Sequence, residues 1–157
     1  MLSSIKTTNR FLNINIIRIG GVNPLFFQHM ASFTFTKDEK LCSRKIIGEM
    51  FLSGNSFLCH PLKVVWINSV DDSASFPVQV AFSVPKRNFK KAHDRNLFKR
   101  QMREAYRYRK NTLYQLFELK GLKLSLMIVF IGKEKSEFLQ IESAMTKVIS
   151  RLDREFA

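Results

Sequence analysis

The clearest hydrophobic pattern in this chain is an alternation of apolar and polar residues over 77–84. Val78, Val80, Phe82 and Val84 fall on one side of this segment, and Gln79, Ala81 and Ser83 fall on the other. Because side chains of a strand point alternately to its two faces, the segment is predicted to be a half-buried strand. The nearly continuous apolar run over 123–131 predicts a central strand buried on both faces. Two shorter strands are predicted near 57–60 and 63–68.

Three segments with helical spacing of apolar residues accompany these strands. The first is predicted over 37–53, where Thr36 and Glu39 have the spacing of a capping box and Gly54 is a plausible stop. The second is predicted to begin at Asp94, acting as the N-cap, and to run to about Glu118. The third covers 138–152 and has one apolar face. The resulting order, α-β-β-β-α-β-α, predicts an α+β fold with helices packed on a small sheet.

Residues 1–30 lack this patterning. Their apolar stretches are interrupted by Arg18, by Gly20-Gly21 and by Pro24, so none reaches the roughly 20 residues of a transmembrane helix. A signal peptide would fit the length but would lack a clean cleavage site. We expect residues 1–30 to be an extension, either disordered or the result of a start site placed upstream of Met30. One domain is then expected over 31–157.

Composition points to a globular protein with a polyanionic partner. The chain of 157 residues is 45% hydrophobic, carries a net charge of +13 and has a pI of about 10.1. Such a balance favours nucleic acid or an anionic membrane as the partner. Cys42 and Cys59 lack metal-ligand spacing and are predicted to be free thiols in a reducing compartment, the cytoplasm. The three histidines are scattered, and no catalytic triad or metal site is apparent in the sequence.

Most of the excess charge lies in one segment, residues 86–110. It contains eleven Lys or Arg residues against Asp94 and Glu104, a net charge of +9 out of +13. On a helix, Arg95, Lys99, Arg103, Arg107 and Lys110 would form a stripe about 120° wide with Arg100 at its edge. Leu97, Phe98, Met102, Ala105 and Tyr108 would pack on the opposite side. A merely solvated face usually mixes charge signs, so this stripe favours nucleic acid, and its arginines suit RNA.

The same segment carries a family resemblance. "KRNFKKAHDRNLFKRQMREAYR" closely resembles the signature of the bacterial ribonuclease P protein component, which is a basic loop followed by spaced Arg-Asn, Lys-Arg and Arg-Glu pairs and a further Arg. Here these are Arg95-Asn96, Lys99-Arg100, Arg103-Glu104 and Arg107. The resemblance extends more loosely from about Phe33 to the C-terminus. It implies a two-layer sandwich with an unusual left-handed β-α-β crossover, where general rules would predict a right-handed one.

The resemblance also implies a function. Ribonuclease P is the endoribonuclease, a ribonucleoprotein, that removes the 5′ leader of precursor tRNA. Its catalytic subunit is an RNA, and Mg²⁺ is held mainly by that RNA and not tightly by the protein. The partners implied are therefore the catalytic RNA and precursor tRNA, with no membrane. The implied RNA-binding residues are Lys86, Arg87, Lys90, Lys91, Arg95, Asn96, Lys99, Arg100, Arg103 and Arg107.

A cleft between the first helix and the sheet holds the leader in this family. By resemblance, its expected residues here are Phe33, Phe51 and Trp66, with Phe51 partly in the core, and Gln79 and Ser83 on the less apolar strand face. Two other readings stay open from the residues alone. One is a non-enzymatic, ribosomal-type RNA-binding protein. The other is a membrane-surface protein, which is the weaker because Leu97, Phe98 and Met102 are needed for packing.

Overall fold

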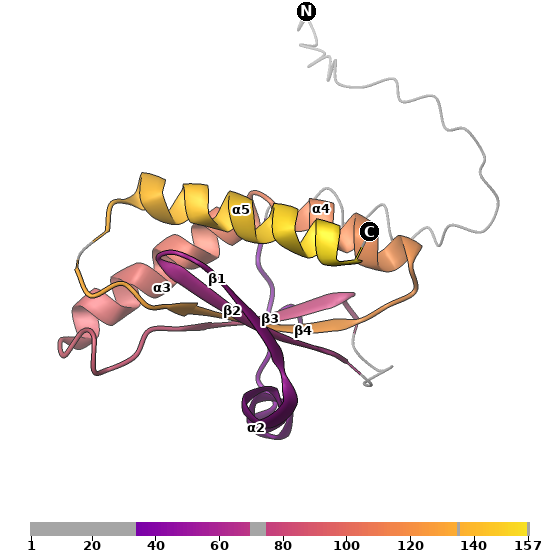
Figure 1. Ribbon diagram of the computed structural model, residues 1–157, viewed down its shortest axis with the longest axis horizontal. Helices are drawn as coiled ribbons and strands as arrows, with labels where there is room; N and C mark the ends of the chain where they lie inside the picture. Colours follow the sequence, from indigo (N-terminus) through magenta and orange to yellow (C-terminus); the bar gives the residue numbers. More distant parts are fainter. Residues whose placement is uncertain (1–33, 70–74, 135, 157) are drawn as a thin grey trace, which may run out of the picture.

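The computed structural model describes residues 34–69, 75–134 and 136–156. These residues form a sheet of four strands in the order β1-β2-β4-β3 (Figure 1). In chain order the elements are α2 (Arg44–Ser53), β1 (Asn55–Cys59), β2 (Leu62–Asn68), β3 (Val78–Ser83), α3 (Ala92–Arg107), α4 (Lys110–Leu119), β4 (Leu124–Phe130) and α5 (Phe138–Phe156). The predicted α+β class is confirmed.

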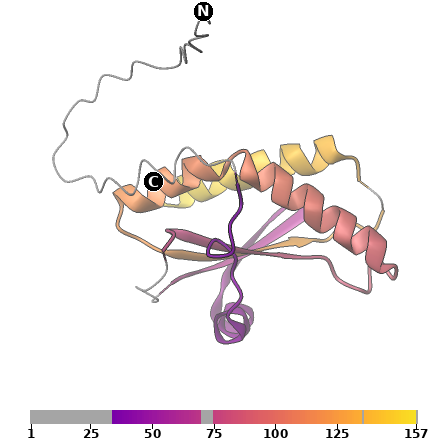
Figure 2. The same ribbon diagram turned by 180° about the vertical axis from the view of Figure 1, so that it is seen from behind.

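The two faces of the sheet are covered unequally. Helices α3, α4 and α5 lie together on one face, and α2 lies alone on the other (Figures 1 and 2). The larger core cluster fills the space between the sheet and the three helices. A small second cluster, built on Leu41, Met50, Val65 and Met127, joins α2 to the opposite face. The helix-rich side therefore holds the main core, and the α2 side leaves much of the sheet accessible.

Both strand patterns predicted from the sequence are confirmed. In β3, Val78 and Val80 are buried toward the helices, while Gln79 and Ser83 are half-buried on the other face. In β4, Leu126 joins the main core and Met127 joins the α2 cluster, so this strand is buried on both sides. β4 pairs antiparallel with β2 and parallel with β3, to which it is connected through α3 and α4. The left-handed sense of this crossover stays a prediction.

The first helix is shorter than predicted. Residues 37–40 form a turn, closed by the amide of Lys40 donating to the carbonyl of Lys37, and α2 begins only at Arg44. The hydroxyl of Ser43 caps it by accepting from the amide of Ile46. The capping box is half present, because the Glu39 carboxylate accepts from the amide of Thr36 at 3.0 Å without starting a helix. Residues 39–41 instead pair with the outer edge of β3 through Val80.

The predicted second helix is two helices. α3 begins at Ala92, with Lys91 as N-cap, so Asp94 lies in the first turn and is not the cap. The chain bends at Tyr108 and Arg109, where the amide of Arg109 donates to the carbonyl of Tyr106 in a tightened turn. No glycine or proline stands at this bend. The bend directs the side chain of Lys110 into the interior.

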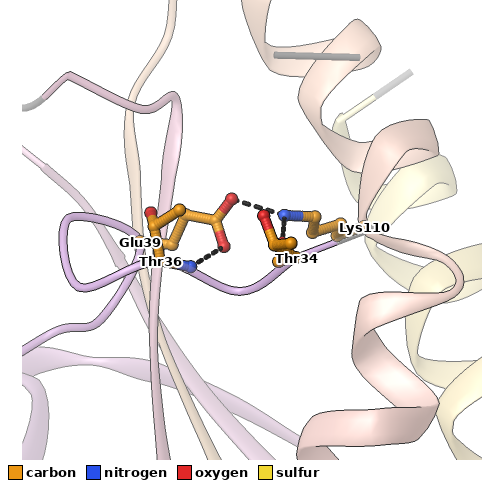
Figure 3. Close-up of polar contacts among 4 residues, drawn as sticks. All are labelled: Thr34, Thr36, Glu39 and Lys110. Carbon is orange, nitrogen blue, oxygen red and sulfur yellow. Dashed lines mark hydrogen bonds and ion pairs between the residues drawn. The ribbon is translucent and has the colours of Figure 1, made fainter. Parts of the chain in front are cut away.

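Lys110 forms a buried ion pair with Glu39 (Figure 3). Lys110 is 0% exposed and Glu39 is 2% exposed. The ammonium also donates to the carbonyl of Thr34. Tyr106 and Tyr114 lie near this pair, and burial raises the pKa of both phenols above the ordinary value. The pair therefore ties the segment preceding α2 to the junction of α3 and α4.

Residues 1–33 are outside the described part of the chain. The predicted extension over 1–30 and the leader residue Phe33 fall there, so both stay predictions. Within the described ranges, no helix is long and apolar enough to cross a bilayer.

Candidate nucleic-acid interface

Helix α3 presents a cationic surface. The set of side chains that faces outward differs from the predicted set, because the helix is rotated about its axis relative to the prediction. Its buried residues are Phe98, Met102, Ala105 and Tyr106, so Tyr106 packs inward and Tyr108 is exposed. Leu97, predicted to be packed, is partly exposed. Lys110, predicted in the stripe, is buried. We call the remaining outward set the α3 face: Asn96, Lys99, Arg100, Arg103 and Arg107.

The cations of helix α3 differ in their intramolecular bonds. Arg107 donates to both carboxylate oxygens of Glu104, at 3.0 and 2.6 Å, and this bond lowers the pKa of Glu104. Arg95 is half-buried and donates to two backbone carbonyls. Arg100 and Arg103 are exposed. The centre of the cationic surface is therefore at these two arginines. Arg100 was predicted at the edge of the stripe, and that prediction is wrong.

The loop before α3, residues 85–91, has an inward and an outward set of side chains. Lys86, Arg87, Lys90 and Lys91 are exposed, as expected for RNA-binding residues. Phe89 is buried against Phe98 and Phe130, with ring centroids 4.7 and 5.8 Å away. We call residues 85–91 the basic loop. It connects the end of β3 to the start of α3.

A groove of about 420 Å³ lies between α2 and the open face of the sheet. We call it the α2 groove. Its wall on α2 includes Met50 and Phe51, and its floor includes Val65 and Val129. Lys63, Ser83 and Arg87 add polar groups to its lining. The groove therefore combines an apolar floor with two cations and the hydroxyls of Ser56 and Ser83.

Two of the predicted leader residues line this groove. Phe51 does so from α2 with 68% of its surface exposed, so the expectation that it is partly core is wrong. Ser83 does so from β3. Gln79 is on the same strand face, but its amide donates to the carbonyl of Asp38 at 3.2 Å, and it does not line the groove.

Trp66 is not in the groove, and its predicted place there is wrong. It is 8% exposed and belongs to the main core on the opposite face of the sheet. Its ring packs against Phe156 of α5 at a centroid distance of 4.8 Å. Trp66 shares the strand face of Leu62 and Val64, which are also buried in that core. This alternation along β2 was the signal that could have placed it correctly.

The same alternation identifies a residue that the sequence analysis missed. Lys63 lies on the β2 face opposite Leu62 and Val64, and so reaches the α2 groove. Arg87, predicted only as a contact to the catalytic RNA, also lines the groove. Across residues 34–69, 75–134 and 136–156, no group of three or more His, Cys, Asp or Glu side chains is arranged to hold a metal ion.

Comparisons with known proteins identify the family of this chain. A family model described as Ribonuclease P matches residues 35–153. The ribonuclease P protein component of Porphyromonas gingivalis is 31% identical over 122 residues, which cover 78% of this chain and 88% of that protein. The ribonuclease P protein component of Chlorobium phaeobacteroides is 39% identical over 107 residues, covering 64% of this chain and 73% of that protein.

Solved structures share the fold. The RNase P protein from Thermotoga maritima aligns with a TM-score of 0.57 at 18% identity, over 71% of this chain and 96% of that one. The RNase P protein of Staphylococcus aureus aligns with a TM-score of 0.53 at 15% identity, over 76% of this chain and 98% of that one. The chain therefore belongs to the family of ribonuclease P protein components, subunits of the endoribonuclease that matures the 5′ end of tRNA.

Proposed function

We propose that the α3 face and the basic loop bind the catalytic RNA of ribonuclease P, and that the α2 groove receives the 5′ leader of precursor tRNA. The observation that carries this proposal is the continuity of the two surfaces. Arg87 belongs to the basic loop and also lines the α2 groove. One cationic path thus runs from the groove to α3, so the protein can contact both RNAs at once.

The α3 face suits a folded RNA. Arg100 and Arg103 are exposed guanidinium groups that can donate two parallel bonds to a phosphate. Asn96 is exposed beside them and can both donate and accept, which suits a ribose hydroxyl or a base edge. The groups of this face thus match the polar edges and phosphates of RNA.

The α2 groove suits a single strand. Single-stranded RNA is held by stacking of bases on aromatic rings and by cations along the backbone. Phe51 offers an exposed ring at the wall of the groove, and Lys63 and Arg87 can neutralise leader phosphates. The Ser83 hydroxyl adds a donor to the same lining.

Catalysis is assigned to the RNA subunit in this proposal. Mg²⁺ would be held by RNA phosphates and, when bound, would supply Lewis-acid activation of a water molecule. The α2 groove and the α3 face are unsuited to a divalent cation, because they present Lys and Arg. In this proposal the protein functions in the cytoplasm. The free thiols of Cys42, which is exposed, and Cys59 support a reducing compartment.

Replacing Phe51 with alanine tests the groove. The loss of one stacked base, about 1–3 kcal/mol, should weaken binding of precursor tRNA to the holoenzyme roughly fivefold to a hundredfold. Binding of mature tRNA should not change, because it has no leader. Leu52→Ala is the matched control, since Leu52 is the next residue on α2, is 90% exposed and does not line the groove. Equal losses for precursor and mature tRNA would contradict the assignment.

Replacing Arg100 or Arg103 with alanine tests the α3 face. Each lost phosphate contact should make the slope of log affinity for the catalytic RNA against log salt shallower by roughly 0.7–0.9. Thermal stability should stay near that of the parent, because both side chains are exposed. Lys147→Ala on α5 removes one exposed charge elsewhere and serves as the control. A salt slope that is the same in all four proteins would place the RNA contact outside the α3 face.

A further inference from the structure

The guanidinium group of Arg95 is bonded to the protein backbone. Its Nη1 donates to the carbonyl of Phe89 at 2.9 Å and to the carbonyl of Lys90 at 2.6 Å. Both carbonyls belong to the basic loop, and Arg95 itself stands in the first turn of α3. The Arg95 side chain therefore connects the end of the basic loop to α3 through hydrogen bonds.

A second polar side chain holds the same loop from the other end. The amide of Asn88 donates to the carbonyls of Ile131 and Gly132, at 3.2 and 3.1 Å. These carbonyls follow β4 directly, so Asn88 ties the loop to the end of the central strand. Between the two polar anchors, the ring of Phe89 is buried against Phe98 and Phe130. Three consecutive residues, 88–90, are thus fixed by their side chains or by their carbonyls.

We propose that Arg95 is a positioning residue: together with Asn88 it holds the basic loop so that Lys86, Arg87, Lys90 and Lys91 face outward before any RNA is bound. Because the loop is already ordered, the four cations lose little conformational entropy on binding, and affinity rises without an added contact. Arg87 is the cation most affected, because it must also reach the α2 groove. The expected effect on RNA affinity rests on the proposed function. The fixing of the basic loop by Arg95 and Asn88 does not.

Asn88 allows the two roles of Arg95 to be separated. Asn88→Ala removes an anchor of the loop without removing a charge. Arg103→Ala removes an exposed charge of the α3 face without touching the loop. Arg95→Ala removes both an anchor and a charge, so its behaviour can be compared with each of the other two.

The first measurement is amide hydrogen exchange of residues 86–91 in the free protein. Arg95→Ala and Asn88→Ala should each speed exchange in this loop, and Arg103→Ala should not. Unchanged exchange in Arg95→Ala would overturn the proposal, whatever its effect on RNA binding. Circular dichroism and thermal unfolding would confirm that each variant is folded. This measurement contains no RNA, so its result is independent of the proposed function.

The second measurement is affinity for the catalytic RNA over a range of salt concentrations. Arg95→Ala and Asn88→Ala should each weaken binding roughly tenfold, as expected for one or two net hydrogen bonds. Both should keep the parent salt slope, whereas Arg103→Ala should make it shallower. The double variant should be little weaker than either single one, because both act through one loop. Additive losses with a shallower slope for Arg95→Ala would assign Arg95 to direct phosphate contact and overturn the proposal.

Discussion

Replacing Lys110 with methionine is expected to destabilise the protein by about 3–5 kcal/mol, because it leaves a buried carboxylate without its partner. Glu39 is 2% exposed, and the amide of Thr36 also donates to it. The carbonyl of Thr34 would lose its bond from the ammonium as well. For a chain of this size, the change corresponds to a fall in Tm of roughly 6–20 °C. Thermal and urea unfolding of the free protein would measure it.

The double variant Glu39→Gln/Lys110→Met distinguishes charge from packing. It removes both charges, and the glutamine carbonyl can still accept from the amide of Thr36. Replacing a buried ion pair as a whole is often neutral, so the double variant should recover most of the lost stability. Lys147→Met, an exposed lysine on α5, should change stability little. If the double variant is as unstable as Lys110→Met, the lost stability comes from the lysine stem and not from the unpaired carboxylate.

Replacing Trp66 with alanine is expected to cost about 3–5 kcal/mol of stability, as for other large aromatic residues in cores. The indole packs on Phe156, which anchors the C-terminal end of α5 to the sheet. Because Trp66 is on the face opposite the α2 groove, any loss of RNA binding should be equal for precursor and mature tRNA.

Trp66→Phe is the control for this prediction, since it keeps an aromatic ring against Phe156 and should lose less stability. Unfolding curves and binding to both tRNA forms, measured below the lowest Tm of the series, would provide the comparison. A stable Trp66→Ala protein that has lost only its preference for precursor tRNA would return Trp66 to the leader site.

The strands could be predicted from the sequence because the burial of one or both faces of a strand determines whether its apolar residues alternate or run continuously. β3 is packed by α3 and α4 on one side and faces the open side with Gln79 and Ser83, so its residues alternate. β4 is covered on both sides and is apolar except for Ser125, which is buried. The same rule applied to β2 would have separated Trp66 from Lys63. The family resemblance that placed Trp66 in the cleft does not fix which face of β2 an aromatic side chain occupies, whereas the alternation does.

The limits of the helices could not be predicted, because tertiary contacts set them. Thr36 and Glu39 have the spacing of a helix start, yet Glu39 is used in a buried ion pair and the chain there pairs with β3. No glycine or proline marks the bend after α3, which directs Lys110 into the interior. Tyr106, and not Tyr108, faces the core because it follows Phe98 and Met102 at four-residue spacing on the buried face of α3. Lys110 is thus buried, although its helical spacing predicts a place in the surface stripe.

The strand order has a consequence for how the chain folds. β4 lies between β2 and β3 but is synthesised after both, and its contacts span the chain from Leu62 to Phe130. Contacts between residues so distant in sequence slow folding. Until β4 docks, β2 and β3 each present an unpaired edge that can pair with another chain. We expect a nascent chain ending before residue 124 to depend on chaperones, and its release from them to coincide with the arrival of β4.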